Sequence, residues 1–216
     1  MTYRSILMAC TATLLLGGTA QAATLVNGSL DGPLANSNVP TGWIALVGTP
    51  DTNNQSTAIN SAYSYGVIPQ DSTDGGTWVG FGNYTQFGNY ERFGQTISDF
   101  VIGQDYTLSW EAVNTSIAGL PAFDNTNGIA VLLDTTLIGT GGLLDMSSDW
   151  TAQDITFTAT STSHLLSFAM SENVTAYLQI DGVSLSEVAP VPVPAGLPLL
   201  LSGLGGLAFL RRHARS

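Results

Sequence analysis

Reactive side chains are scarce in this 216-residue chain, and most of them are carboxylates. The chain has no lysine, one cysteine (Cys10) and two histidines, of which only His164 lies away from the C-terminus. There is no Gly-x-Ser-x-Gly elbow, and a zinc site needs more nitrogen or sulfur donors than His164 supplies. The members of a Ser-His-Asp triad need only meet in the folded protein, so the sequence does not identify one. A glycosidase needs two carboxylates a few ångströms apart, and among sixteen carboxylates many pairs could qualify, so their presence does not identify an active site. We therefore expect no enzyme activity and no required cofactor. A secreted hydrolase that depends on His164 is the weakest alternative.

Aromatic residues, glycines and asparagines recur with a six-residue spacing between residues 81 and 94. Aromatic rings stack on sugars at small entropic cost, and amides bond to sugar hydroxyls. The candidate sugar ligands are Tyr84, Tyr90, Asn83 and Asn89. In an extended chain Phe81, Phe87 and Phe93 share one face and the tyrosines point the other way. The alternative is that the phenylalanines are core and the tyrosines are ordinary surface residues.

The charge distribution excludes one class of partner. All sixteen carboxylates lie between Asp31 and Glu187, where the only cationic residue of fixed charge is Arg92. Affinity for nucleic acid depends on lysines and arginines that displace counterions from phosphates. We therefore expect no nucleic-acid partner, and docking to an anionic membrane surface is disfavoured.

The first 22 residues are typical of a secretory signal. Arg4 supplies the positive start, an apolar stretch runs from Ile6 to Leu16, and the small residues Ala20 and Ala22 mark the cleavage site. The expected partners are the secretion translocon and signal peptidase. Cleavage would remove Cys10 and leave a mature chain without disulfides or thiolate metal sites.

The last 28 residues, 189–216, have three consecutive parts. A proline-bearing motif comes first, then an uncharged apolar segment over residues 195–210, which we expect to be a short membrane helix. Basic residues close the chain, and the positive-inside tendency would keep them in the cytoplasm. They are Arg211, Arg212 and Arg215.

This order of parts resembles the PEP-CTERM sorting signals of Gram-negative bacteria, which membrane proteases called exosortases process. The motif is closest to the variant written Val-Pro-Leu-Pro-Ala, and its residues here are Val191, Pro192, Val193, Pro194 and Ala195. The prolines keep the backbone extended, as a protease substrate requires. The resemblance implies an exosortase partner and transient anchoring in the inner membrane. The alternative is a retained membrane anchor.

Residues 23–188 alternate polar and apolar side chains between frequent turn signals, which predicts an all-β antiparallel sandwich. Strands are expected over residues 106–111, around 155–157, over 166–170, and over 178–180 and 183–185 with a break at Asp181-Gly182. Residues 128–133 are uniformly apolar and predict a strand covered on both faces. A turn is expected at 139–142. The four tryptophans, Trp43, Trp78, Trp110 and Trp150, are expected in the core.

The order of these segments resembles the galactose-binding-like jelly rolls of carbohydrate-binding modules. The resemblance rests on residues 25–31 at the start, 39–43, 95–110 and the closing run 177–185. It implies a structural calcium ion held by Asp31 and Asp181 with help from Asn27, and hard oxygen ligands suit calcium. The alternative is that both aspartates only form turns.

These observations together predict an exported protein of the cell envelope surface or extracellular matrix. The first functional hypothesis is a structural or adhesive matrix component associated with exopolysaccharide. The second is a carbohydrate-binding module with a defined sugar site.

Overall fold

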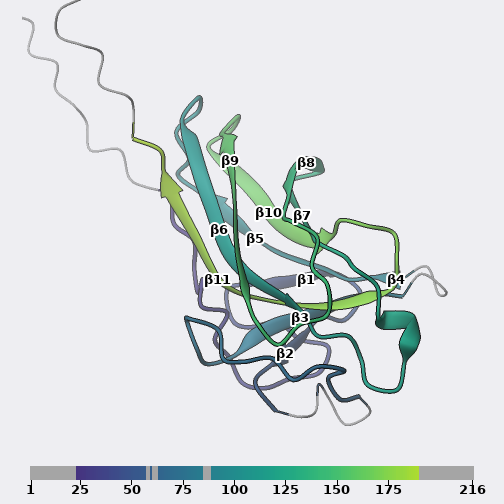
Figure 1. Cartoon of the computed structure of the whole chain (residues 1–216). Helices are drawn as coiled ribbons and strands as arrows, with labels where there is room; N and C mark the ends of the chain where they lie inside the picture. Colours follow the sequence, from purple (N-terminus) through teal and green to yellow (C-terminus); the bar gives the residue numbers. More distant parts are fainter. Residues whose placement is uncertain (1–22, 57–58, 60–62, 85–88, 190–216) are drawn as a thin grey trace, which may run out of the picture.

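The computed structural model describes residues 23–56, 59, 63–84 and 89–189 of the chain. Two antiparallel sheets pack face to face (Figure 1). The five-stranded sheet has the order β1 (Ile44–Val47), β5 (Arg92–Ser98), β10 (Ser163–Met170), β7 (Ile129–Leu133) and β8 (Thr136–Thr140). The six-stranded sheet has the order β2 (Asp51–Asn53), β3 (Trp78–Tyr84), β11 (Ala176–Glu187), β6 (Asp105–Asn114) and β9 (Thr151–Thr158), and β4 (Asn89–Tyr90) pairs with β3. The predicted all-β sandwich is therefore confirmed.

The only regular helix in the described part of the chain is the 3₁₀ helix η2 (Pro121–Phe123). Among those residues no helix has the length and apolar character to cross a membrane. The predicted signal segment, with Ala20 and Ala22, lies outside the described residues. So does the predicted sorting signal, with its motif and arginines.

The main core lies between the sheets and follows the alternation of the strands. Leu108, Trp110 and Ala112 of β6 point inward, and the intervening residues of this strand point away from the core. Trp43 contacts Phe93 and Phe168 with ring centroids 5.4 and 5.9 Å apart. Phe81 and Phe93 are fully buried here, as the sequence predicts, while Phe87 lies outside the described residues.

Three of the four tryptophans are buried, as expected, and Trp150 is the exception. Trp43 and Trp110 belong to the main core, but Trp78 packs on the opposite face of the six-stranded sheet, because Val79 and Phe81 take the inward positions of β3. Trp150 is half-buried and meets Trp78 edge-on, with ring centroids 5.2 Å apart. Its indole N–H donates to the Gln70 carbonyl at 2.7 Å. The pair covers the outside of the sheet.

Two positions predicted to lie in turns, Asp181-Gly182 and Gly139, lie within strands, while residues 141–142 of the second predicted turn follow the end of a strand. β11 runs unbroken from Ala176 to Glu187, because a bulge between Asp181 and Ser184 absorbs Gly182, whose φ is +58°. β8 likewise continues through Gly139, where the backbone packs against Ile155 of β9. The expected strand over residues 128–133 is β7, which lies between β10 and β8 and is almost wholly buried.

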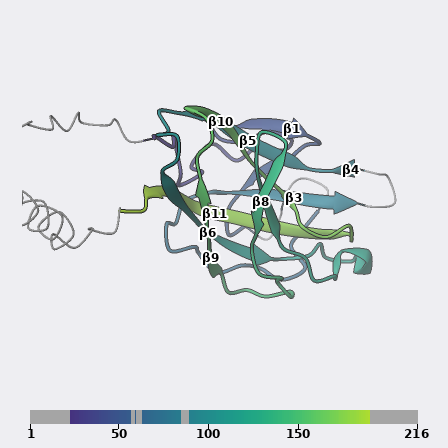
Figure 2. The same cartoon turned by 90° about the horizontal axis from the view of Figure 1, so that it is seen from above.

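The two ends of the described domain lie at the same end of the sandwich. Figures 1 and 2 show both ends of the coloured ribbon on one side of the sandwich, with β4 and η2 at the opposite end. The Val188 N–H bonds to the Asp105 carbonyl at 2.9 Å and holds the end of β11 against the start of β6. The far end, where β11 begins, carries the candidate site.

Candidate functional site

A pocket of about 230 Å³ opens on the outer face of the six-stranded sheet. Leu178 and Ile180 point into the main core, so their neighbour Tyr177 points to the outer face of β11. Gly82 of β3 lies beside Tyr177 in register and lines the same pocket. The remaining lining residues come from the strand ends and loops around them: Ser37, Thr49, Asp51, Ile59, Tyr63, Tyr84, Glu91, Ile117 and Phe123.

A second apolar cluster forms one wall of this pocket. Tyr177 packs with four buried residues from the loops that cover the sheet, which are Ile59, Tyr65, Ile117 and Phe123. Tyr84 joins them by stacking on Phe123, with ring centroids 5.3 Å apart and an interplanar angle of 17°. The pocket therefore presents aromatic surface that is held rigidly in place.

Glycine at two positions of β3 makes room for the floor of the site. A Cβ on Gly80 would lie 2.3 Å from Asn53 Nδ2 and 2.6 Å from the Tyr177 hydroxyl oxygen. A Cβ on Gly82 would lie 3.0 Å from the Tyr177 ring. The space at Gly80 is used by a buried network, in which Asn53 Nδ2 donates to Tyr177 Oη and Gln179 Oε1, both at 3.3 Å. These glycines mark a close approach of side chains to a strand.

Two carboxylates line the pocket and are held by donors of the protein. Asp51 accepts the Ser37 N–H at 2.7 Å and the Tyr177 hydroxyl at 2.8 Å. Glu91 accepts the Gly82 N–H at 2.7 Å and both the N–H and the hydroxyl of Thr49 at 3.0 Å. The two side chains are thus oriented by bonds from four separate segments of the chain.

Burial raises the pKa of both carboxyl groups. Desolvation is the main cause for Asp51, and the bonds from Ser37 and Tyr177 oppose it. Desolvation also dominates for Glu91, opposed by the bonds from Gly82 and Thr49 and reinforced by the charge of Asp51. Burial and these two negative charges also raise the pKa of Tyr177. The three groups therefore form one electrostatically coupled set.

The negative charge of this set has no basic partner. Arg92 is the only lysine or arginine between residues 23 and 190 of the sequence. Among the described residues no arginine forms an ion pair with a carboxylate, and the one ionic contact is that of His164 with Asp134. The pocket is therefore rich in hydrogen-bond acceptors and negative in potential.

The structure does not bring the four predicted sugar ligands to one surface. Tyr84 lines the pocket. Asn83 and Tyr90 are paired across β3 and β4 and so share the other face of this hairpin. Asn83 is buried, with its amide 3.4 Å from the Glu172 carbonyl, and Tyr90 is 47% exposed. Asn89 is the strand partner of Tyr84.

The three predicted calcium ligands have unequal surroundings. Asn27 uses its side chain within its own loop, donating to the carbonyls of Asp31 and Thr41 at 2.9 Å and accepting the Asp31 N–H at 3.2 Å. Asp31 accepts the Thr77 N–H at 3.0 Å. Asp181 is fully buried, and its Oδ2 accepts the Ser72 hydroxyl.

The pKa of the Asp181 carboxyl group is strongly shifted. Burial raises its pKa to about 7, and the negative charges of Asp74 and Asp31 add to the effect. Its Oδ1 has no hydrogen-bond partner in the protein. A free buried oxygen near two other carboxylates is compatible with a cation, but the described residues hold no group of three or more histidine, cysteine or acidic side chains arranged around one metal position.

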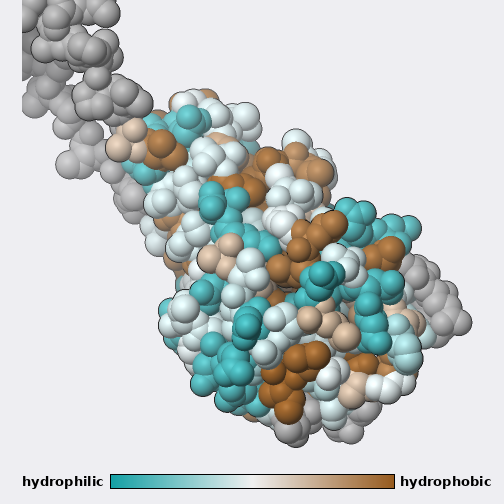
Figure 3. All heavy atoms as spheres, in the orientation of Figure 1, coloured by the Kyte–Doolittle hydropathy of each residue, from teal (hydrophilic) through white to brown (hydrophobic). Residues whose placement is uncertain are grey.

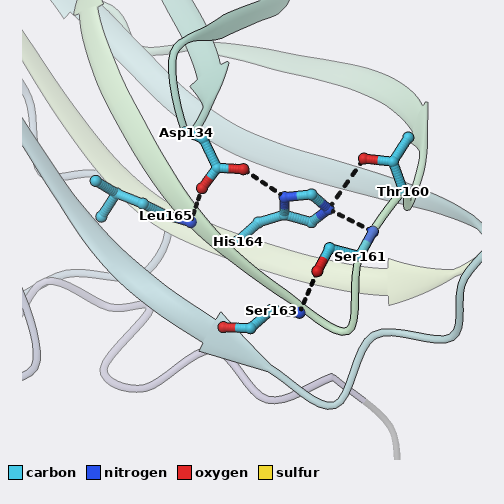
Figure 4. Close-up of polar contacts among 6 residues, drawn as sticks. All are labelled: Asp134, Thr160, Ser161, Ser163, His164 and Leu165. Atoms are coloured by element: carbon cyan, nitrogen blue, oxygen red, sulfur yellow. Dashed lines mark hydrogen bonds and ion pairs between the residues drawn. The ribbon is translucent and has the colours of Figure 1, made fainter.

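The buried side chain of His164 contacts the exposed carboxylate of Asp134 (Figure 4). The Ser161 N–H donates to Nε2 at 3.1 Å, so this nitrogen accepts and Nδ1 carries the proton that bonds to Asp134 Oδ2 at 2.8 Å. The Thr160 hydroxyl lies 3.4 Å from Nε2. Both ring nitrogens are therefore engaged.

Asp134, the partner of His164, is itself held in place by the backbone. It has a positive φ of +57° in the turn between β7 and β8, and its Oδ1 accepts the Leu165 N–H at 3.0 Å. The bond from Leu165, followed by that from His164, holds the pKa of Asp134 below its ordinary value. These hydrogen bonds connect β10 to the turn between β7 and β8, which indicates a structural role for His164 and Asp134.

Sequence reasoning missed most of the pocket. It did not single out Asp51, Tyr177 or Phe123, which lie far apart in the chain, nor Glu91, which stands inside the segment that it did examine. The usable signal was the glycine pair at 80 and 82, because glycine within a strand indicates a close approach to its backbone.

No protein-family model matches the sequence, and no characterised protein matches it. Among solved structures, a cyclase from Fischerella sp. TAU superposes with a TM-score of 0.53 at 17% identity, covering 80% of this chain and all of the cyclase. An arabinose-bound α-L-arabinofuranosidase gives 0.48 at 13% identity over 77% of this chain and 26% of the enzyme. A CBM4 structure gives 0.41 at 18% identity over 76% of this chain and all of that one. The first likeness shows that the chain has the β-sandwich fold of the cyclase; the similarity to carbohydrate-binding modules is more distant.

Proposed function

We propose that this protein is an exported binding protein that recognises extracellular polysaccharide through the pocket on the outer face of its six-stranded sheet. One observation carries the proposal: Tyr84, stacked on Phe123, lines the same pocket as the carboxylates of Asp51 and Glu91. Sugar rings present apolar C–H faces that pack on aromatic rings, and their hydroxyls donate to carboxylate oxygens. This pocket favours a defined sugar site over a purely structural or adhesive role in the matrix.

Selectivity would come from the rigid surroundings of the site. The carboxylates are oriented by backbone donors, and Tyr177 is fixed by its bond to Asp51, so a ligand would meet groups that are already in place. Preorganised sites lose less conformational entropy on binding. Exposed apolar side chains on the face seen in Figure 3 occur in separate patches among polar ones, which leaves the pocket as the better-defined feature for recognition.

Binding without catalysis is part of the proposal. The hydrolase alternative depends on His164, and the Ser161 N–H occupies the ring nitrogen that would have to accept a proton from a nucleophile. His164 is also 4% exposed, and the residues that line the pocket do not include it.

The route of the protein to the cell surface is proposed from its terminal sequences. The segment 1–22 would direct export, and residues 191–195 would be cleaved by an exosortase-type protease while residues 195–210 anchor the chain in the inner membrane. The intact mass of the protein recovered from cells and medium tests this route. A mass that corresponds to residues 23 to about 194 supports both cleavages, whereas retention of Arg211, Arg212 and Arg215 would indicate a permanent anchor.

A structural calcium ion at Asp181 and Asp31 also remains a proposal. The free Oδ1 of buried Asp181 supports it, and Asp74 is a further carboxylate near this position. A calcium ion there would supply positive charge to a cluster that the protein itself leaves negative.

Binding to a glycan array tests the proposed function with a matched pair of tyrosine variants. We expect the full chain to bind a restricted set of glycans and Tyr84→Ala to weaken that binding about tenfold, which corresponds to about 1.4 kcal/mol of lost stacking. Tyr90→Ala should bind normally, because Tyr90 lies on the other face of the hairpin. Equal loss in both variants, or binding to no glycan, would contradict the proposed site.

A further inference from the structure

The carboxylates of the pocket constrain the charge of its ligand. We propose that the sugar unit that enters this pocket carries a protonated amine, as in a polysaccharide of glucosamine type, and that Asp51 and Glu91 bind the ammonium group. This inference rests on the proposed function and adds a chemical class to it. Its basis is that two carboxylates line one small pocket and no lysine or arginine of the described chain is paired with either.

Burying a charge without a partner is costly, and proteins normally avoid it. Asp51 is only 7% exposed, and the charge of Asp51 acts on Glu91, so the two repel each other. A cationic ligand would remove this cost, while a neutral sugar would leave it in place. While both groups are ionised, a positive charge in the pocket would offset this cost and a neutral ligand would not.

The remaining hydrogen-bond capacity matches an ammonium group. An ionised carboxylate has about four acceptor positions. Among the described residues, hydrogen-bond donors fill two of these positions on Asp51 and three on Glu91. About three acceptor positions are left in total, and an ammonium group has three N–H donors.

Aromatic rings in the same wall favour this ligand further. Tyr84 and Phe123 line the pocket as a stacked pair, and Tyr63 and Tyr177 line it as well. A cation near the face of such a ring is attracted by the negative charge of the π-system. The volume of about 230 Å³ is below the roughly 300–1,000 Å³ of sites for drug-sized ligands, so the pocket suits one sugar ring rather than a chain segment.

Proton release should accompany binding. The ionisable groups that act on one another here are Asp51, Glu91, Tyr177 and Tyr65. Burial raises the pKa of both carboxyl groups, and a bound cation would lower it again, so protons would leave the pocket on binding. Affinity should therefore fall as the pH is lowered and the carboxylates become protonated.

Isothermal titration calorimetry of the full chain with three β-1,4-linked trisaccharides tests the inference. The sugars are the glucosamine trimer, its fully N-acetylated form and cellotriose, which share a backbone and differ at C2. We expect the glucosamine trimer to bind at least tenfold more tightly than the other two at pH 6. The enthalpy should also vary with the ionisation enthalpy of the buffer, as proton release requires.

Variants separate the charge effect from general damage to the pocket. Asp51→Asn and Glu91→Gln should each reduce the preference for the glucosamine trimer about tenfold, whereas Asp154→Asn, an exposed control on β9, should not. Equal or tighter binding of the acetylated or neutral trimer to the unmodified chain would overturn the amine inference and leave the proposed sugar site intact. Failure of the glucosamine trimer to bind would also overturn the inference, and the glycan array would then decide the proposed function separately.

Discussion

Asp181 makes the stability of this protein depend on pH in a direction that a single substitution can reveal. Its carboxyl group is fully buried, and its pKa rises from 3.8 to about 7, chiefly through desolvation. The folded state therefore binds more protons than the unfolded state between about pH 4 and pH 7. The stability that protonated Asp181 contributes is complete below pH 4 and is lost as the pH rises through about 7.

The size of the stability change follows from the size of the pKa shift of Asp181. A tenfold change in a protonation constant is worth about 1.4 kcal/mol, so the free energy of unfolding should fall by about 4 kcal/mol across this window. Asp181→Asn removes the titration and keeps the shape of the protonated side chain. At pH 7.5 the variant should be more stable than the unmodified chain by about 2 to 4 kcal/mol, after allowance of about 1 kcal/mol for an imperfect hydrogen bond.

Urea unfolding between pH 4 and pH 8 in the presence of EDTA measures the effect. The difference between the variant and the unmodified chain isolates Asp181 from Asp51 and Glu91, which titrate in the same direction in both proteins. Asp154→Asn serves as an exposed control. Parallel pH profiles for Asp181→Asn and the unmodified chain would refute the assignment of a raised pKa to this group.

Three further predictions concern other parts of the molecule. Calcium should raise the melting temperature of the unmodified chain at pH 7.5 and leave Asp181→Asn unchanged; identical shifts in both would place any calcium elsewhere. Gly80→Ala should cost about 2 to 4 kcal/mol in urea unfolding, because its Cβ would lie 2.3 Å from Asn53 Nδ2, whereas Gly142→Ala, with no neighbour closer than 3.9 Å, should be nearly neutral. His164→Ala should lower the free energy of unfolding by about 2 to 3 kcal/mol, and under conditions in which the variant is fully folded it should bind glycan like the unmodified chain. Loss of glycan binding by the folded variant would contradict a purely structural role for His164.

The sandwich could be predicted because alternation is a local property of each strand. From Tyr106 to Ala112 of β6 and from Asp154 to Phe157 of β9, apolar residues that point inward alternate with polar ones, so the sequence there specifies both the element and the buried face. The failures at Asp181-Gly182 and Gly139 have a common cause. Glycine permits a turn, but a bulge or a close strand contact uses the same freedom, and only the neighbouring strand decides between them.

The pocket could not be predicted in the same way, because its residues meet only after the chain folds. Asp51 and Tyr177 are 126 positions apart and bond directly. Phe123 reaches Tyr84 from a 3₁₀ turn that has no periodic pattern of its own. Position in the repeat is a poor guide to the exposed face, since Tyr84 and Tyr90 occupy equivalent places in the six-residue repeat but opposite faces of the hairpin.

Strand β11 connects the two ends of the sandwich. It contributes Tyr177 to the pocket at its start, ends at Glu187 beside the exit of the chain, and is flanked on both sides by β3 and β6. A pulling force between a bound ligand and residue 189 would act along this strand, parallel to its axis. The hydrogen bonds to both flanking strands would then share the load in shear and would have to break together rather than one after another. If the domain binds a ligand as proposed, this arrangement would resist forces that pull the bound ligand and the end of the chain apart.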